Sequence, residues 1–223
     1  MNRSRELIIF GNGGLASVVK FYTDKIGLKV ACFCADGAYL EGDRFESLPN
    51  IAFEELARYF PPERYQMFVA IGASDMLGDV REKKMAESRK MGYSLYSYPG
   101  SSHLQDRVQI GLNVFVMPGC SVDPFVMFGD GVIAWNGSVI SHHTIVDDYS
   151  FIAPGAVICG KVNIGRHCFI GSNATIRDNL KIADRTLVGA GAVITHDTEL
   201  GGVYLPAKTV RIGRSSDTMS FHS

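Results

Sequence analysis

The 223-residue sequence has few of the features that would place a chain in a membrane or on a polyanion. It has no apolar run of membrane-spanning length, and residues 1–10 lack the basic start and apolar centre of a secretory signal. Its 22 basic and 23 acidic residues nearly cancel, so no overall field would attract nucleic acid or anionic lipid. We therefore expect a cytoplasmic protein with neither nucleic-acid nor membrane partners.

Cysteine is scarce, and its five residues are an odd number. Cys32 and Cys34 flank one residue of an expected strand, which is not the spacing of a metal site. Cys120 and Cys168 stand where the repeat described below requires a small apolar side chain. We expect all five thiols to be reduced and structural, and we expect no metal site.

The sequence is instead rich in a six-residue period, which runs through residues 110–198 without an insertion or deletion. Each of the fifteen hexads begins with an apolar residue, and nearly all have a small or β-branched fifth residue, as in ISHHTI and IAPGAV. Helices repeat near 3.6 residues and strands near 2, so a sustained period of six indicates a hexapeptide β-solenoid. The alternative is an ordinary antiparallel sandwich with accidental spacing.

In such a solenoid each hexad forms a short strand and one corner of a triangular prism, with its first residue in the core. Three hexads complete a coil, so residues eighteen apart in the sequence should stack on one another. This rule places Gly160 next to His142 on the following coil.

Residues 6–98 have a different pattern, in which short apolar runs alternate with amphipathic ones. This alternation predicts a small parallel α/β sheet. The expected strands are 6–10, 30–34, 67–71 and 93–98; the expected helices are 15–25, 53–60 and 76–91, the last with Arg81, Glu82, Lys83, Lys84 and Glu87 facing solvent.

A glycine turn at residues 11–14 joins the first strand to the first helix, an arrangement that brings phosphate to a helix N-terminus. The turn is weak evidence by itself, because tight turns need glycine anyway. Ala16 and Ser17 break the full dinucleotide fingerprint, so a half-site for a nucleotide-sugar fits better. Asp36 follows the second strand, where it could accept hydrogen bonds from a ribose or a base.

This layout resembles the bacterial sugar acyltransferases that include bacillosamine-type UDP-amino-sugar N-acetyltransferases and sialic acid O-acetyltransferases. The resemblance implies a Rossmann-like half-domain over residues 1–98 and a left-handed parallel β-helix over residues 99–223. It also implies a homotrimer with active sites between neighbouring prisms. The matching stretches are IIFGNGGLASVV, FCADG, FVAIG, VFVMPGCSVDP, residues 135–160 and LPAK at 205–208.

His142 and His143 point outward at a corner, where a lone histidine would be an ordinary surface residue. The resemblance implies that His142 is the general base, which takes a proton from the acceptor as it attacks acetyl-CoA. It also implies that the Gly160 N–H meets the thioester oxygen. The chain departs from its relatives in two places, because His143 replaces a usual acid and Phe151 replaces a frequent second histidine.

The resemblance assigns two further groups of residues. The pantetheine arm of coenzyme A would pass Ser172 and Ala190, and a CoA phosphate could meet Lys208. Relatives often have two acids after the second strand where this chain has Ala35 and Asp36, which leaves the nucleotide open. The nucleotide would be held by Gly13, Gly14, Leu15 and Asp36.

We expect an acetyl-CoA-dependent N-acetyltransferase of a nucleotide-linked amino sugar, with His142 as base, His143 aiding it, and direct acetyl transfer. An O-acetyltransferase of a sialic-acid-like sugar is the second hypothesis. A non-catalytic nucleotide-sugar-binding trimer is the third, because the acid is missing and Phe151 replaces a histidine. Residues 201–223 should form a final strand or loop over the last coil, followed by a disordered polar tail. His103, His167 and His196 are expected to be structural or surface residues.

Overall fold

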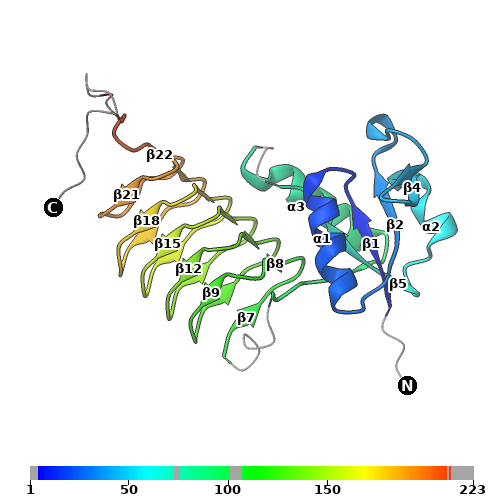
Figure 1. The fold of residues 1–223 in the computed structure, drawn as a ribbon, viewed down its shortest axis with the longest axis horizontal. Coiled ribbons are helices and arrows are strands. Elements are labelled where there is room, and N and C mark those ends of the chain that lie inside the picture. The colour runs from blue at the N-terminus through cyan, green and yellow to red at the C-terminus, as the bar shows by residue number, and fades with distance from the viewer. Residues whose placement is uncertain (1–4, 73–75, 101–106, 210, 212–223) are drawn as a thin grey trace, which may run out of the picture.

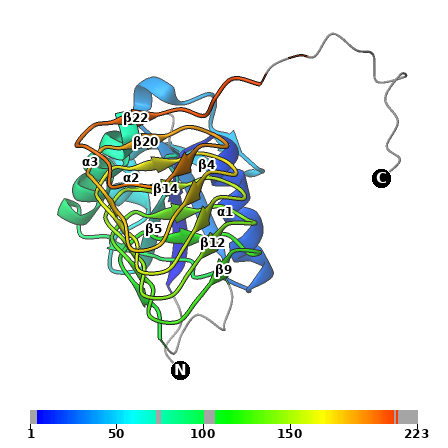
Figure 2. The ribbon, with the colours of Figure 1, turned by 90° about the vertical axis from the view of Figure 1, so that its left-hand side faces the viewer.

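The computed structural model describes residues 5–72, 76–100, 107–209 and 211. An α/β domain lies at the end of a long prism of stacked coils where the prism begins (Figure 1). Figure 2 looks along the prism, whose coils enclose one apolar core. Within the described ranges, no helix has the length and apolar character needed to cross a membrane. His103 and most of the predicted tail lie outside these residues.

The α/β domain alternates strands and helices along the chain as the sequence predicts. Its sheet has the order β3-β4-β2-β1-β5-β6, and every pair is parallel except β3 with β4. The elements are β1 (Glu6–Phe10), α1 (Gly14–Lys25), β2 (Val30–Ala35), β3 (Arg44–Phe45), β4 (Leu48–Ala52), α2 (Leu56–Tyr59), β5 (Tyr65–Val69), α3 (Asp79–Lys90) and β6 (Ser94–Leu95); 3₁₀ turns cover Gly37–Tyr39, Phe53–Glu55 and Met76–Gly78.

The domain differs from the prediction in its β3–β4 hairpin and in one helix. Glu46 and Ser47 form the hairpin turn with φ of 47° and 65°, a left-handed conformation that glycine or asparagine usually signals. The expectation that Arg81 and Lys84 face solvent is wrong, since they are 0% and 9% exposed. Both are buried because their polar ends reach hydrogen-bond acceptors described below.

The prism consists of three parallel sheets of two-residue strands, consistent with a left-handed β-helix. We name them the β7, β8 and β9 sheets after their first strands. The strands are β7 (Gln109–Ile110), β8 (Phe115–Val116), β9 (Ser121–Val122), β10 (Met127–Phe128), β11 (Ile133–Ala134), β12 (Val139–Ile140), β13 (Ile145–Val146), β14 (Phe151–Ile152), β15 (Val157–Ile158), β16 (Asn163–Ile164), β17 (Phe169–Ile170), β18 (Thr175–Ile176), β19 (Lys181–Ile182), β20 (Leu187–Val188), β21 (Val193–Ile194) and β22 (Val203–Tyr204).

The strand registers confirm the stacking rule. Met127 pairs with Ile145 and Val139 pairs with Val157, so stacked residues are eighteen apart. Residues that begin hexads, such as Ile140 and Ile158, are fully buried in the core. Each such isoleucine contributes about 2 kcal/mol by leaving water. The segment over the last coil, for which the sequence left a strand or a loop open, is a strand, because β22 pairs with β20.

Each edge of the prism is a column of corners between two sheets. The His142 edge (residues 141–144, 159–162 and 177–180) separates the β9 and β7 sheets. The Tyr149 edge (129–132, 147–150, 165–168 and 183–186) separates the β7 and β8 sheets. The Ser172 edge (135–138, 153–156, 171–174 and 189–192) separates the β8 and β9 sheets.

The α/β domain packs on the outer face of the β8 sheet and on the Tyr149 edge. Phe115 and Ile133 of this sheet are fully buried in one apolar cluster with Leu7 and Phe68 of the domain. The His142 edge joins the other two sheets, so it lies opposite the face that carries the domain. A division between residues 98 and 99 remains our proposal, since Tyr98 already bridges to Phe115 of the first coil.

Candidate active site

A pocket of about 620 Å³ opens where β1, β2 and β5 end. β1 lies between β2 and β5, so the pocket occupies the point at which the strand order reverses, where open α/β sheets bind ligands. The sequence-predicted nucleotide residues are brought together here. The lining is Phe10, Gly11, Asn12, Gly13, Gly14, Leu15, Ala35, Asp36, Tyr39, Ala70, Ile71, Gly72, Val80 and Lys84.

The N-terminus of α1 faces this pocket with an uncapped first turn. Its N-cap residue Gly13 makes no side-chain cap, and no acidic residue occupies the first turn. A methyl group on Gly13 or Gly14 would meet no atom within 4 Å, so a ligand can approach the backbone closely. Free N–H groups and the helix dipole suit a phosphate here.

Asp36 has a cationic partner that sequence reasoning missed. Lys84 Nζ lies 2.6 Å from Asp36 Oδ1 and 2.6 Å from Glu87 Oε2. Burial alone would lower the pKa of Lys84, but hydrogen bonds to Asp36 and Glu87 outweigh it and raise that pKa. The sheet topology could have predicted this contact, because the helix after β5 must cross the edge of the sheet at which β2 ends.

His142 and His143 are exposed on the His142 edge, in contact through their rings. Their Nδ1 atoms lie 3.1 Å apart, so one Nδ1 must donate its proton to the other. If His142 donates, its Nε2 carries the lone pair that a base requires. The His143 ring packs against the Phe125 ring at a tilt of 31°, with ring centres 4.7 Å apart, and the Arg107 guanidinium lies 5.6 Å from the Phe125 ring centre.

Gly160 stacks directly on His142, as the eighteen-residue rule predicts. A methyl group on Gly160 would lie 2.7 Å from His142 Cε1 and 2.8 Å from Nε2, so only glycine leaves the ring in place. At the same hexad position, the N–H groups of Asp130 and Arg166 bond to aspartates 2.7 and 2.9 Å away. The Gly160 N–H has no such acceptor among the residues that the structure describes.

The remaining predicted residues lie elsewhere on the prism. Ser172 is half-buried and Ala190 is exposed on the Ser172 edge, where the Gly191 N–H donates to the Ser172 carbonyl at 2.8 Å. One protomer therefore does not bring them to His142. Phe151 is half-buried on the β8 sheet and stacks on Phe169, with ring centres 5.5 Å apart. Lys208 is exposed beyond β22.

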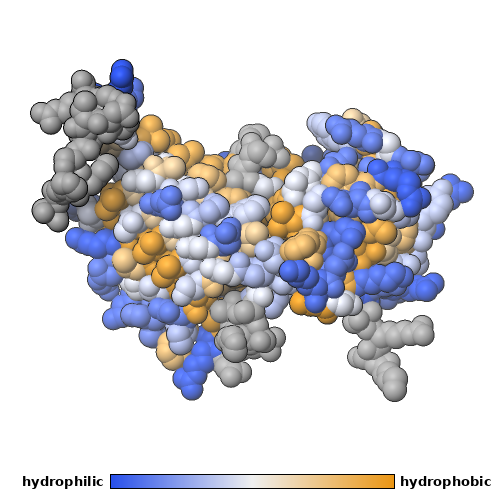
Figure 3. Space-filling model, in the orientation of Figure 1, coloured by the Kyte–Doolittle hydropathy of each residue, from blue (hydrophilic) through white to orange (hydrophobic). Residues whose placement is uncertain are grey.

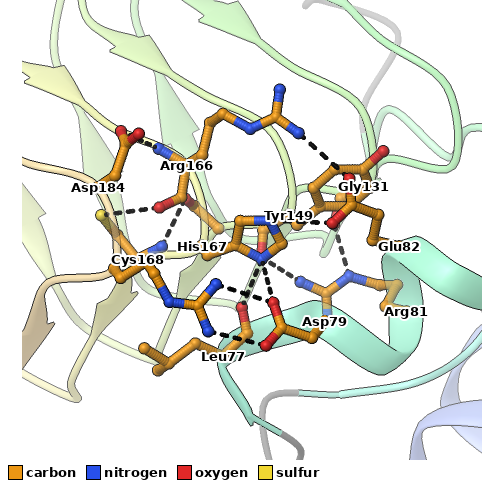
Figure 4. Close-up of polar contacts among 12 residues, drawn as sticks. Leu77, Asp79, Arg81, Glu82, Gly131, Tyr149, Arg166, His167, Cys168 and Asp184 are labelled. Carbon is orange, nitrogen blue, oxygen red and sulfur yellow. Dashed lines mark hydrogen bonds and ion pairs between the residues drawn. The ribbon is translucent and has the colours of Figure 1, made fainter. Parts of the chain in front are cut away.

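One group of side chains has the composition of a metal site. Asp79, Glu82 and His167 offer ligand atoms within 4.8 Å of one another. Arg185 pairs with Asp79 at 2.8 Å, and Arg166 with Glu82 at 3.3 Å. The chain's own cations thus already bind both carboxylates, as Figure 4 shows for the cluster around His167.

Two family models match separate parts of the chain. The model described as the PglD N-terminal domain matches residues 6–85, which cover the α/β domain from β1 into α3. The model described as the bacterial transferase hexapeptide with six repeats matches residues 161–196 of the prism.

Solved structures match nearly the whole chain. The acetyltransferase domain of PglB from Neisseria gonorrhoeae FA1090, in complex with acetyl coenzyme A, is 26% identical with a TM-score of 0.79. That match covers 93% of this chain and 100% of the other. A histidine-to-asparagine mutant of perosamine N-acetyltransferase from Caulobacter crescentus, in complex with CoA and GDP-perosamine, is 25% identical with a TM-score of 0.80. It covers 90% of this chain and 93% of the other.

The α/β domain, the hexapeptide prism and these matches agree with one another. The chain is a hexapeptide-repeat transferase with a PglD N-terminal domain, and over nearly its whole length it is similar to solved sugar N-acetyltransferases.

Proposed function

We propose that the protein transfers an acetyl group from acetyl-CoA to the amine of a nucleotide-linked amino sugar. The observation that carries the proposal is the His142 ring beside the Gly160 backbone on an exposed edge of the prism. The pocket at the α1 N-terminus supports a nucleotide acceptor. The similar Caulobacter enzyme was solved with CoA and GDP-perosamine, which supports both ligand classes.

In the proposed mechanism, the neutral amine attacks the thioester carbonyl directly. His142 Nε2 takes the proton that the amine loses as the N–C bond forms. The Gly160 N–H donates to the oxygen of the tetrahedral intermediate, which then collapses with cleavage of the C–S bond. His142 returns the proton to the CoA thiolate, so no covalent enzyme intermediate forms.

His143 would orient the base in this mechanism. By accepting a hydrogen bond from the His142 Nδ1–H, His143 would stabilise the His142 tautomer in which Nε2 carries no proton. A neutral imidazole supplies no negative charge, so we expect a weaker base than a carboxylate partner would give. Phe125 supports the His143 ring from its other side.

We further propose a homotrimer whose sites lie between subunits. The nucleotide pocket belongs to the domain on the β8 sheet, whereas His142 lies on the opposite edge and Ser172 on a third. A second copy would bring these parts together. The outer residues of the β9 sheet (Ser121, Val139, Val157, Thr175 and Val193) carry no charge and suit such packing, and apolar residues are exposed over the prism in Figure 3.

The reaction is tested with purified protein, acetyl-CoA and nucleotide-linked sugars that present either an amine or a hydroxyl group. Mass spectrometry of the products should find an added acetyl group on the amino sugar only. Acetylation of a hydroxyl group instead, including that of a sialic-acid-like sugar, would make the protein an O-acetyltransferase. If calorimetry detects no binding of acetyl-CoA, the result would support the hypothesis of a non-catalytic nucleotide-sugar-binding trimer.

Subunit complementation tests the shared site. His142→Ala and Asp36→Ala chains are purified separately, mixed under conditions that exchange subunits, and assayed. Activity well above that of either variant is expected, because some interfaces would combine an intact base with an intact pocket. No gain in a mixture that light scattering finds to contain trimers would place the whole site within one subunit.

A further inference from the structure

One wall of the nucleotide pocket is formed by Ala70, Ile71 and Gly72, which directly follow Val69, the last residue of β5. Two buried polar side chains attach this wall and Val69 to the prism. The two side chains are Asn113, from the first coil, and Arg81, from α3. We call this pair the wall clamp.

Asn113 pairs with the backbone of Val69 as a neighbouring strand would. Its Oδ1 accepts from the Val69 N–H at 2.7 Å, and its Nδ2 donates to the Val69 carbonyl at 3.1 Å. The side chain is 0% exposed, and its backbone is left-handed with φ of 57°, which asparagine adopts more readily than most residues. The first coil of the prism thus fixes the end of β5.

Arg81 reaches in two directions from the first turns of α3. Its Nη1 donates to the carbonyls of Ile71 and Gly72, at 2.9 and 2.8 Å, in the pocket wall. Its Nε donates to the Gly131 carbonyl at 2.8 Å and its Nη2 to the Tyr149 carbonyl at 2.5 Å, both on the Tyr149 edge. Figure 4 shows Arg81 extended from α3 toward Gly131 and Tyr149.

The guanidinium of Arg81 is unusual in having only main-chain carbonyl partners among the described residues. It is 0% exposed, and burial lowers its pKa to about 10, so it remains charged at neutral pH. Burial of a charged group costs much free energy unless its donors find hydrogen-bond acceptors. A planar fork of five donors can meet four carbonyls on two sides, whereas an ammonium group cannot.

Two glycines allow the close contact that Arg81 needs. A methyl group on Gly78, just before α3, would lie 2.7 Å from the Tyr149 carbonyl oxygen. A methyl group on Gly131 would lie 2.8 Å from Tyr149 Cδ1 and 3.0 Å from Met85 Sδ. Larger residues at either position would push α3 away from the prism.

We infer that Arg81 and Asn113 are positioning residues for the nucleotide-linked acceptor, because they hold the pocket wall in a fixed place relative to the prism. The inference rests on the proposed function, in which the prism carries the base. Since neither side chain reaches the His142 edge, the wall clamp should govern use of the nucleotide-sugar and leave acetyl-CoA binding unchanged. The fold of the prism does not require it, because the coils have their own core.

The test compares Arg81→Lys and Asn113→Gly with the control Lys83→Met. Lys83 lies on the same helix, and its side chain is 72% exposed. Among the described residues its one ion pair is with Glu87, at 4.0 Å. For both clamp variants we expect kcat/KM for the nucleotide-sugar to fall about tenfold or more. The KM for acetyl-CoA should change less than about twofold, and the control should match the wild type.

Nucleotide binding and hydrogen exchange keep the test independent of turnover. Calorimetry with UDP and GDP should give weaker binding in both clamp variants, and the amides of residues 69–72 should exchange faster. If the wild type binds a nucleotide but acetylates no amino sugar, the proposed function fails while these measurements still test the clamp. Unchanged nucleotide affinity and exchange in Asn113→Gly would overturn the inference. An equal loss for both substrates, accompanied by a lower Tm, would also overturn it by assigning the pair a purely structural role.

Discussion

Two histidines of the prism occupy the same hexad position with the same backbone but have opposite surroundings. His143 and His167 are each fourth in their hexads, with φ of 61° and 56°. His143 is exposed and contacts the rings of His142 and Phe125. His167 is 7% exposed beneath α3, where its ring nitrogens lie 3.3 Å from Asp79 and 3.2 Å from Glu82.

The difference shows that a repeat fixes where a side chain points, while the neighbouring structure decides what it can do. α3 covers the Tyr149 edge and supplies carboxylates that hold His167 in place. Nothing within the described part of the protomer covers the His142 edge, so His142 keeps a ring nitrogen free for a substrate. His167 therefore serves the contact between the prism and α3, whereas His142 remains exposed.

Replacement of His142 should give the largest effect. We expect His142→Ala to lower kcat by about 10²-fold or more, because the attacking amine would lose its base. The Tm should hardly change, since the side chain is exposed. His196→Ala is the matched control, because His196 is also exposed on the outside of the prism and should leave kcat unchanged. Near-wild-type turnover in His142→Ala would remove the base from our mechanism.

Addition of one methyl group at Gly160 should come next. We expect Gly160→Ala to lower kcat about tenfold or more, because the Cβ would occupy the space of the His142 ring and crowd the N–H. The exposed Lys161→Ala, at the adjacent corner position, serves as control. Full activity in Gly160→Ala would mean that the thioester oxygen is bound elsewhere.

A smaller effect is expected at His143, whose proposed role is to orient the base. His143→Asn should lower kcat a few-fold, on the order of a lost hydrogen bond. His143→Asp should retain or raise kcat, because a carboxylate would both fix the tautomer and stabilise the imidazolium. Both residues tolerate a left-handed backbone, so the pair isolates the charge. Steady-state kinetics in which Asp is the worse replacement would contradict this role.

The smallest effect concerns the pH dependence of stability at the covered edge. A hydrogen bond from Arg185 lowers the pKa of Asp79 from its ordinary value of 3.8, with a lesser contribution from His167. A lowered pKa stabilises the fold above the unfolded-state value, and this stabilisation is lost as pH falls through the folded-state value. Because both partners are partly exposed, it should amount to less than about 1 kcal/mol.

Thermal unfolding measured between pH 5 and pH 3 checks this prediction. The wild type should lose Tm as the pH falls below about 4, and Asp79→Asn should lose less over the same interval. Turnover at neutral pH should be far less affected than in His142→Ala. Parallel Tm curves for wild type and Asp79→Asn would mean that solvent screens this contact completely.

Much of the fold could be predicted from the sequence, because a strict six-residue period specifies which residues on successive coils contact one another. The hexads predicted the strands, the buried first residues and the contact of Gly160 with His142. The glycine turn and Asp36 likewise predicted the pocket lining. Both predictions needed only the stacking rule or the topology of a parallel sheet.

The roles of the α3 side chains could not be predicted, because they depend on how two domains meet. The sequence predicted that Arg81, Glu82 and Lys84 would face solvent on a charged helix, yet each meets a partner more than forty residues away in sequence. Glu46 and Ser47 were missed for another reason, since their turn conformation is usually signalled by glycine or asparagine. Local propensity carries no information about either.

The regular coil also sets which changes of length this architecture can absorb. Insertion of one complete coil of eighteen residues after Ile176, or deletion of one, would leave every later side chain on its original edge. Only the length of the prism would change. A gain of six residues would instead rotate everything downstream by one face, moving Ser172-edge residues onto another edge. Changes of length in such a prism should therefore come in whole coils, because any other change would move Ala190 off the edge that it shares with Ser172.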